Sequence, residues 1–150
     1  EDTRHHPFGV RSRAQVSQLK RLLLMMITLI YAQLILGAAL RHTGGPLVAL
    51  SHIVSAFFVL VHAVAIGVRT FHDFPCEEKF TRPALFLGWF TLLQTALGMG
   101  AFIYRISLRD IVQVPAGKIF FVTAHQTVGA LVLAGAVFFA LRVCRRGSDG

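Results

Sequence analysis

Four long apolar segments constrain this chain more than any other feature of its sequence. They span residues 22–40, 46–68, 83–104 and 119–141, and each has about the 20-residue length that a helix needs to cross a bilayer. All seven acidic residues lie outside them. The segments are continuous rather than alternating every second residue, which favours helices over barrel strands. With short connections, they predict an all-α integral membrane protein folded as an antiparallel four-transmembrane-helix bundle.

The segments around these spans are short and polar. We expect residues 1–20 to form a basic surface segment, residues 21–143 to be one membrane domain, and residues 144–150 to be a short tail. Gly44 and Gly45 followed by Pro46 predict a tight turn and a helix start. Cys76 and Cys144 lack the spacing of a metal motif, so we interpret them as free thiols.

The formal net charge of +8 is interpreted through topology rather than as a nucleic-acid site, because Lys and Arg collect on the cytoplasmic flanks of membrane helices. Alternating spans place eleven basic residues on the side of both termini, namely Arg4, Arg11, Arg13, Lys20, Arg21, Arg69, Lys79, Arg82, Arg142, Arg145 and Arg146. Four lie on the other side: Arg41, Arg105, Arg109 and Lys118. Both termini are therefore predicted to be cytoplasmic, in a bacterial inner membrane or its equivalent, with membrane lipid as a partner.

Two histidines lie at matching depths in spans that run in the same direction. His52 is about six residues into the second span and His125 about seven into the fourth, which puts both roughly 10 Å below the outer surface at about 1.5 Å per residue. An ionisable side chain in hydrocarbon marks a functional site by default, and two facing imidazoles can ligate one haem iron. We predict one low-spin haem b held by His52 and His125. A hydrogen-bonded structural role is the alternative.

Small and cationic residues near the two histidines fit a flat, anionic cofactor. Ala56 and Gly129 each follow a histidine by four residues and so share its helix face, although small residues also mark ordinary helix contacts in membranes. Arg41 and Arg105 close the first and third spans on the outer side. We predict that they contact haem propionates, and the alternative is snorkelling to the interface.

The other intramembrane histidine does not fit the same site. His62 follows His52 by ten residues, so it lies about 15 Å deeper and is rotated by roughly 80° around the helix. We expect His62 to be hydrogen-bonded to a neighbouring helix or to face a partner subunit. No Asp or Glu occurs inside the spans, so no carboxylate is available there for acid–base catalysis.

A weak internal repeat relates the two halves of the chain. Gln33 to Gly37 in the first span and Gln94 to Gly98 in the third share the pattern Q-x-x-L-G. The span that follows each copy supplies one histidine. The repeat predicts two helical hairpins related by a pseudo-two-fold axis, with the histidines placed symmetrically about it.

The segment from Tyr31 to Gly44, YAQLILGAALRHTG, resembles the first-helix signature of haem A synthases, the membrane enzymes of cytochrome oxidase assembly. The segments around Ser51-His52 and AHQTVGA (residues 124–130) are similar to the haem-ligand helices of that family. The family has two pseudo-symmetric four-helix halves, and the resemblance covers one half, over residues 20–145.

One departure from the family pattern bears on catalysis. The catalytic half of the family carries a glutamate three residues before its second-helix histidine, whereas here Ala49 precedes His52 and Val59 precedes His62 at that spacing. The resemblance is therefore to the non-catalytic half, which holds a permanent haem b. It implies that this chain alone is not catalytic, and that its partner is a second membrane subunit or a missing N-terminal half.

Three functions are consistent with these features of the sequence. The first is a haem b half in haem A biosynthesis or terminal oxidase assembly. The second is a small b-type cytochrome that transfers electrons in a respiratory or photosynthetic membrane complex. The third is a structural membrane subunit derived from a haem protein. The partner chain distinguishes the first from the second, and a purified protein without a haem spectrum would favour the third.

Overall fold

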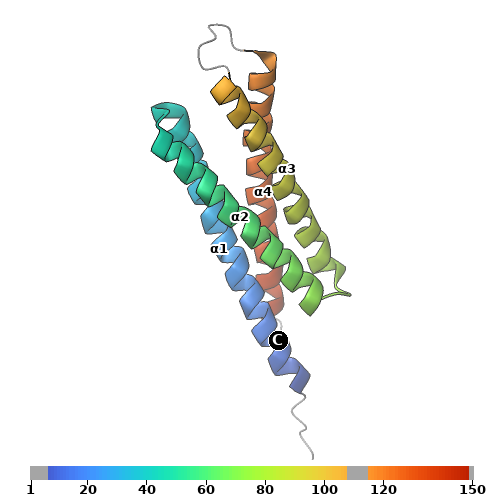
Figure 1. Ribbon diagram of the computed structural model, residues 1–150. Coiled ribbons are helices and arrows are strands. Elements are labelled where there is room, and N and C mark those ends of the chain that lie inside the picture. The colour runs from blue at the N-terminus through green and yellow to red at the C-terminus, as the bar shows by residue number, and fades with distance from the viewer. Residues whose placement is uncertain (1–6, 108–114, 149–150) are drawn as a thin grey trace, which may run out of the picture.

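The computed structural model describes residues 7–107 and 115–148, and over those residues it is a bundle of four helices. These are α1 (Pro7–Thr43), α2 (Pro46–Asp73), α3 (Glu78–Ser107) and α4 (Ala116–Ser148). Consecutive helices run in opposite directions, and α1 packs against α2 and α4 while α3 packs against the same two helices (Figure 1). The predicted all-α class and antiparallel bundle are confirmed.

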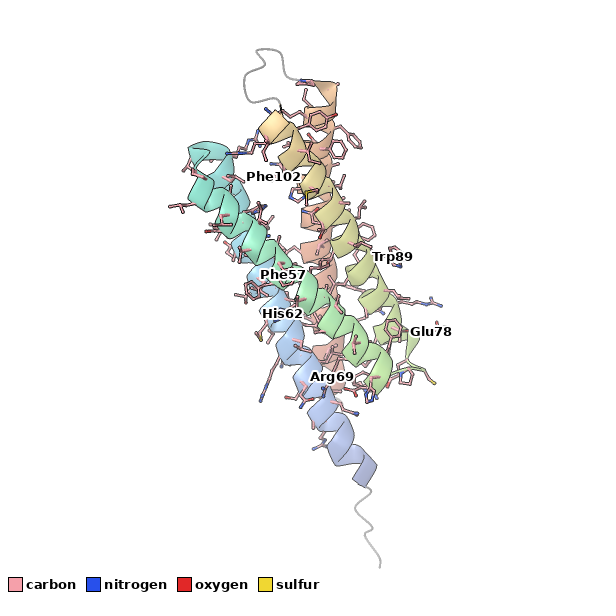
Figure 2. The ribbon with its side chains drawn as sticks, viewed as in Figure 1. Phe57, His62, Arg69, Glu78, Trp89 and Phe102 are labelled. Atoms are coloured by element: carbon pink, nitrogen blue, oxygen red, sulfur yellow. The ribbon has the colours of Figure 1, made fainter. Side chains whose placement is uncertain are left out.

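All four helices are long and apolar enough to cross a membrane, over Arg13–Thr43, Pro46–Asp73, Glu78–Ile106 and Ala116–Arg146. Large apolar side chains cover the outside of the bundle (Figure 2). Phe57 on α2 and Trp89 on α3 are about two-thirds exposed. An apolar exterior of this extent matches a lipid environment and not water, so the chain is an integral membrane protein.

Within the described residues, α1 and α4 extend beyond the spans that the sequence suggested. Residues 7–20 continue directly into the first span, so the boundary expected at residue 20 marks a change of polarity inside α1. Val16 and Leu19 in this stretch are buried. No Gly or Pro interrupts residues 10–36, and residues such as Leu, Lys, Arg and Gln propagate a helix well. The helix α4 likewise continues through the expected tail to Ser148.

The turn between α1 and α2 forms as its residues predict. Gly44 has a φ of 64°, a left-handed conformation that suits glycine. Its N–H donates a hydrogen bond to the Leu40 carbonyl at 3.1 Å and so ends α1. Gly45 is the N-cap of α2, and Pro46 is its first residue, where the missing N–H costs nothing.

The helix α3 begins before the predicted span and contains Pro83. A proline in a helix leaves the carbonyl four residues earlier without its usual donor. That carbonyl belongs to Lys79, and Arg142 on α4 donates a hydrogen bond to it at 3.3 Å. The proline is therefore accommodated by a contact between α3 and α4. The basic residue Arg109, predicted to lie on the outer side, is outside the described residues.

Burial divides the bundle into two halves. We call residues 13–30, 59–91 and 129–146 the closed half, and residues 31–58, 92–106 and 115–128 the open half. Every buried side chain among those that the structure describes lies in the closed half, including Leu23, Ile66, Leu87 and Phe139. The α1–α2 hairpin diverges from the α3–α4 hairpin toward the end that carries the Gly44 turn (Figure 1).

Charged residues gather at the end of the closed half. The carboxyl group of Asp73 is almost fully buried and lies 2.8 Å from Arg69 Nε, and Gln15 on α1 donates to it at 3.3 Å. Arg146 on α4 donates to the Glu77 carboxylate and lies over the Phe74 and Phe80 rings. The hydrogen bond from Arg146 lowers the pKa of the Glu77 carboxyl. These contacts join all the helices at this end.

Both cysteines are free, as predicted. Cys76 is exposed in the α2–α3 loop, and Cys144 is half-buried near the end of α4. No disulfide therefore constrains the closed half, and its helices are held by packing and polar contacts alone.

Candidate functional site

The open half brings together the two histidines that the sequence singled out. His52 extends from α2 and His125 from α4, so each hairpin supplies one ring. The ring centres lie 6.4 Å apart, and the ring planes meet at 82°. Nitrogen–metal distances of about 2 Å put the ring centres of two ligands on opposite sides of one ion roughly 6 Å apart. The separation of the two rings suits a shared metal ion.

The His125 ring is held by Gln94 of the neighbouring helix α3. His125 Nδ1 lies 3.1 Å from the Gln94 carbonyl oxygen, and the carbonyl can only accept, so Nδ1 carries the proton in this arrangement. His125 Nε2 then accepts a hydrogen bond from the Gln94 amide at 3.5 Å. Histidine ligands usually donate their second N–H to a carbonyl in this way. A metal ion bound at Nε2 would therefore have to take the place of the Gln94 amide.

The His52 ring has fewer hydrogen-bond partners than the His125 ring. The Gln33 amide of α1 donates to the His52 carbonyl at 3.0 Å, and Ser55 Oγ donates to Gln33 Oε1 at 3.0 Å. These bonds fix the backbone beside the ring. His52 Nδ1 itself is buried with no hydrogen-bond partner among the described residues. The Nδ1 edge of the ring faces α1 at Gly37, and the described residues offer it no donor or acceptor.

Two glycines face the rings from the neighbouring helices. A Cβ added at Gly98 would lie 2.8 Å from His125 Cε1, closer than real Cβ contacts come. A Cβ at Gly37 would lie 3.4 Å from His52 Cε1. The sequence indicated Gly37 and Gly98 only as parts of the repeat and suggested no role for them. Their shared position four residues after a glutamine was the available signal.

The two small residues expected beside a haem plane have different surroundings. Gly129 is buried on α4, and a Cβ there would lie 2.9 Å from Gln94 Nε2. Gly129 therefore makes room for the Gln94 side chain. Ala56 is half-buried on α2, one turn after His52.

The two arginines predicted to contact propionates lie at the same end of the bundle as the histidines. Arg105 Nη2 donates to the Gly44 carbonyl at 2.7 Å, and this bond joins α3 to the α1–α2 turn across the diverging hairpins. Arg41 is exposed in the last turn of α1. Both cations border the open half, and Arg105 is bound to a neutral acceptor that an anion could replace.

His62 lies apart from this site. It belongs to the closed half and lies between Phe57 and Arg69 along α2 (Figure 2). Its Nδ1 lies 3.0 Å from the Phe58 carbonyl of the same helix. This contact lies within α2, so it is not the hydrogen bond to a neighbouring helix that the sequence suggested, and the alternative of a partner subunit stays a prediction.

Two imidazoles are the number of protein ligands that a six-coordinate haem iron needs. Two imidazoles alone are too few for a bare transition metal, which takes four or more ligands. A haem brings four nitrogens of its own and needs only the two axial positions.

Comparisons with known proteins add no identification. A scan against protein-family models, a search of curated proteins and a search of solved structures each found no match. The function is therefore inferred from the geometry of the site.

Proposed function

We propose that this protein is a membrane haem b-binding protein in which His52 and His125 are the axial ligands of one iron between the two hairpins. The observation that carries this proposal is the pair of rings, 6.4 Å apart and supplied by different hairpins. They lie in the half of the bundle where no described side chain is buried. A flat apolar cofactor there would supply the packing that the side chains do not.

The residues of the chain have distinct roles in this proposal. The Gln94 carbonyl would keep the proton of His125 on Nδ1, and the iron would replace the Gln94 amide at the Nε2 lone pair. Arg105, which donates to the Gly44 carbonyl, would hold a propionate instead, because a hydrogen bond to a charged acceptor is the stronger one. Arg41 is the second propionate partner. When bound, the haem supplies one-electron exchange, and two protein ligands on the iron leave no position open for a substrate.

The site favours electron transfer over acid–base chemistry. The carboxylates that the structure describes are Asp73, Glu77 and Glu78, and all three lie in the closed half. We propose that the chain acts as a haem b half resembling that of haem A synthases, in haem A biosynthesis or terminal oxidase assembly. A catalytic carboxylate would then come from a partner membrane subunit.

A small b-type cytochrome serving a respiratory or photosynthetic complex is the second candidate. The absence of any described carboxylate near the histidines supports this role equally, because an electron-transfer haem needs no acid. Isolation of the chain with its native partners separates the two: a second four-helix subunit with a glutamate and two histidines supports the first, and a redox subunit supports the second.

The test of haem binding is a reduced-minus-oxidised spectrum of the purified chain. Wild-type protein is expected to give a low-spin b-type spectrum. Since each histidine supplies half of the axial ligation, His52→Ala and His125→Ala should each abolish that low-spin spectrum. His62→Ala is the matched control, because it removes an intramembrane imidazole that contacts the Phe58 carbonyl of its own helix, and it should retain the spectrum.

An equal loss of the spectrum in all three variants would contradict the assignment of ligands. It would show that the spectrum is lost because the helices are destabilised. A wild-type chain without a haem spectrum would contradict the proposal itself and leave the structural subunit as the remaining interpretation.

A further inference from the structure

We propose that the two copies of the internal repeat, Gln33–Gly37 on α1 and Gln94–Gly98 on α3, are positioning elements that hold the two axial imidazole planes close to perpendicular. This inference rests on the proposed haem site. The inference goes beyond that site because it states what fixes the orientation of the two imidazole rings and which electronic state of the iron results.

The α3 copy contacts the His125 ring at three of its atoms. The Gln94 carbonyl lies 3.1 Å from Nδ1, the Gln94 amide lies 3.5 Å from Nε2, and the Cβ position of Gly98 is 2.8 Å from Cε1. Contacts along one edge of a ring restrict its rotation about the bonds that join it to the helix. Only a glycine at position 98 lets the ring lie this close to α3.

The α1 copy holds the backbone of His52, and Gly37 lies beside its ring. Gln33 binds the His52 carbonyl and accepts from Ser55, so α1 is fixed against this turn of α2. The Cβ position of Gly37 is 3.4 Å from His52 Cε1 and 3.9 Å from Nδ1. Gly37 therefore faces the same edge of His52 that Gly98 faces on His125. The contact is looser, and Nδ1 has no hydrogen-bond partner among the described residues.

The two rings held in this way meet at an interplanar angle of 82°. Rotation of an imidazole about an iron–nitrogen bond has a low intrinsic barrier, so the protein contacts decide the angle between two axial rings. Perpendicular rings make two of the iron d orbitals nearly equal in energy. Parallel rings separate these two orbitals. The angle between the two ring planes therefore affects the electronic state of the oxidised iron, and it can be measured without an assay of activity.

Electron paramagnetic resonance of the oxidised, haem-loaded protein tests the inference. Near-perpendicular rings give a strongly anisotropic low-spin signal with one large g value, whereas parallel rings give a rhombic signal with three well-separated g values. The wild-type protein is expected to give the anisotropic signal. A rhombic wild-type signal would overturn the inference and leave haem binding intact.

Four glycine substitutions then locate the origin of the angle. Gly98→Ala should turn the His125 ring and shift the largest g value toward the rhombic type. Gly37→Ala should cause a smaller shift, because its new methyl group meets His52 at a longer distance. Gly67→Ala and Gly88→Ala are matched controls within α2 and α3, where an added Cβ has no neighbour within 4 Å. All four changes raise helix propensity equally.

The outcomes separate this inference from the proposed function. An unshifted signal in Gly98→Ala would overturn the positioning role, while haem binding would stand. If Gly98→Ala does not accumulate, the Gly37→Ala variant tests the inference instead. A Gly37→Ala signal identical to that of Gly67→Ala would overturn it. Absence of any low-spin haem in the wild-type protein would instead overturn the proposed function.

Discussion

The closed and open halves of this bundle are built from the same four helices but are held together differently. In the closed half, side chains such as Leu19, Leu23 and Phe139 are fully buried between the helices. In the open half no described side chain is buried, and the described polar contacts between the hairpins include the bond from Arg105 to Gly44. One half has a core of its own, and the other half has two facing histidines.

The closed half is packed by its own buried side chains, whereas the side chains of the open half are half-buried or exposed. Membrane helices associate through van der Waals contact and polar bonds, because lipid is as apolar as the side chains. The open half has polar contacts within each hairpin, but its side chains are less buried than those of the closed half. We therefore expect the closed half to contribute most of the stability of the haem-free bundle.

The largest effect is expected from matched truncations in the two halves. Leu87→Ala in the closed half removes a fully buried side chain of α3. It should lower the free energy of unfolding of the haem-free protein by about 2–5 kcal/mol, the cost of a cavity that its neighbours do not fill. Leu97→Ala changes a half-buried residue of the same helix in the open half, and it should cost about 1 kcal/mol.

Unfolding in mixed micelles with increasing denaturing detergent would measure both values. Because both variants carry the same substitution in one helix, the change in helix propensity cancels between them. Equal costs would contradict the division into a closed and an open half.

A smaller effect is expected at the charged end of the closed half. Arg146 lowers the pKa of Glu77 in the folded state, so the carboxylate stabilises the fold above its unfolded pKa of about 4.3. That contribution is lost as the pH falls through the lower, folded pKa. Glu77→Gln should therefore reduce stability by about 1 kcal/mol at neutral pH, the size of a partly exposed ion pair. The difference from wild type should shrink below about pH 4.

Thermal unfolding in detergent over a series of pH values would follow this change. Glu78→Gln is the matched control, since Glu78 pairs with Arg82 where both side chains are about three-quarters exposed. It should change stability little at any pH. A Glu77→Gln deficit that persists at pH 3 would show that the lost contact does not depend on the charge of the carboxylate.

The fold was predictable because hydropathy alone identifies membrane helices. The four spans, the Gly44 turn and the start of α2 at Pro46 all follow from local residues. The extension of α1 back to Pro7 did not follow, because a change of polarity was interpreted as a change of structure. Polar residues continue a helix as readily as apolar ones do.

The site was predictable only in part. The matching depths of His52 and His125 follow from their positions in two spans of the same direction, and the structure brings their rings together. The Gln94 carbonyl that binds His125 and the bond from Arg105 to Gly44 depend on how the helices are rotated about their axes. The repeat indicated that Gln33 and Gln94 are equivalent, but spacing alone did not show that each lies beside a histidine.

The most direct test of haem ligation by the two histidines is a titration of haem b into the haem-free, detergent-solubilised chain, followed by the Soret band. We expect saturation at one haem per chain, with a six-coordinate low-spin spectrum, and no such species in the His52→Ala, His125→Ala double variant. A wild-type titration without a break at one equivalent would contradict this ligation, as would a double variant that forms the same low-spin species with unchanged affinity.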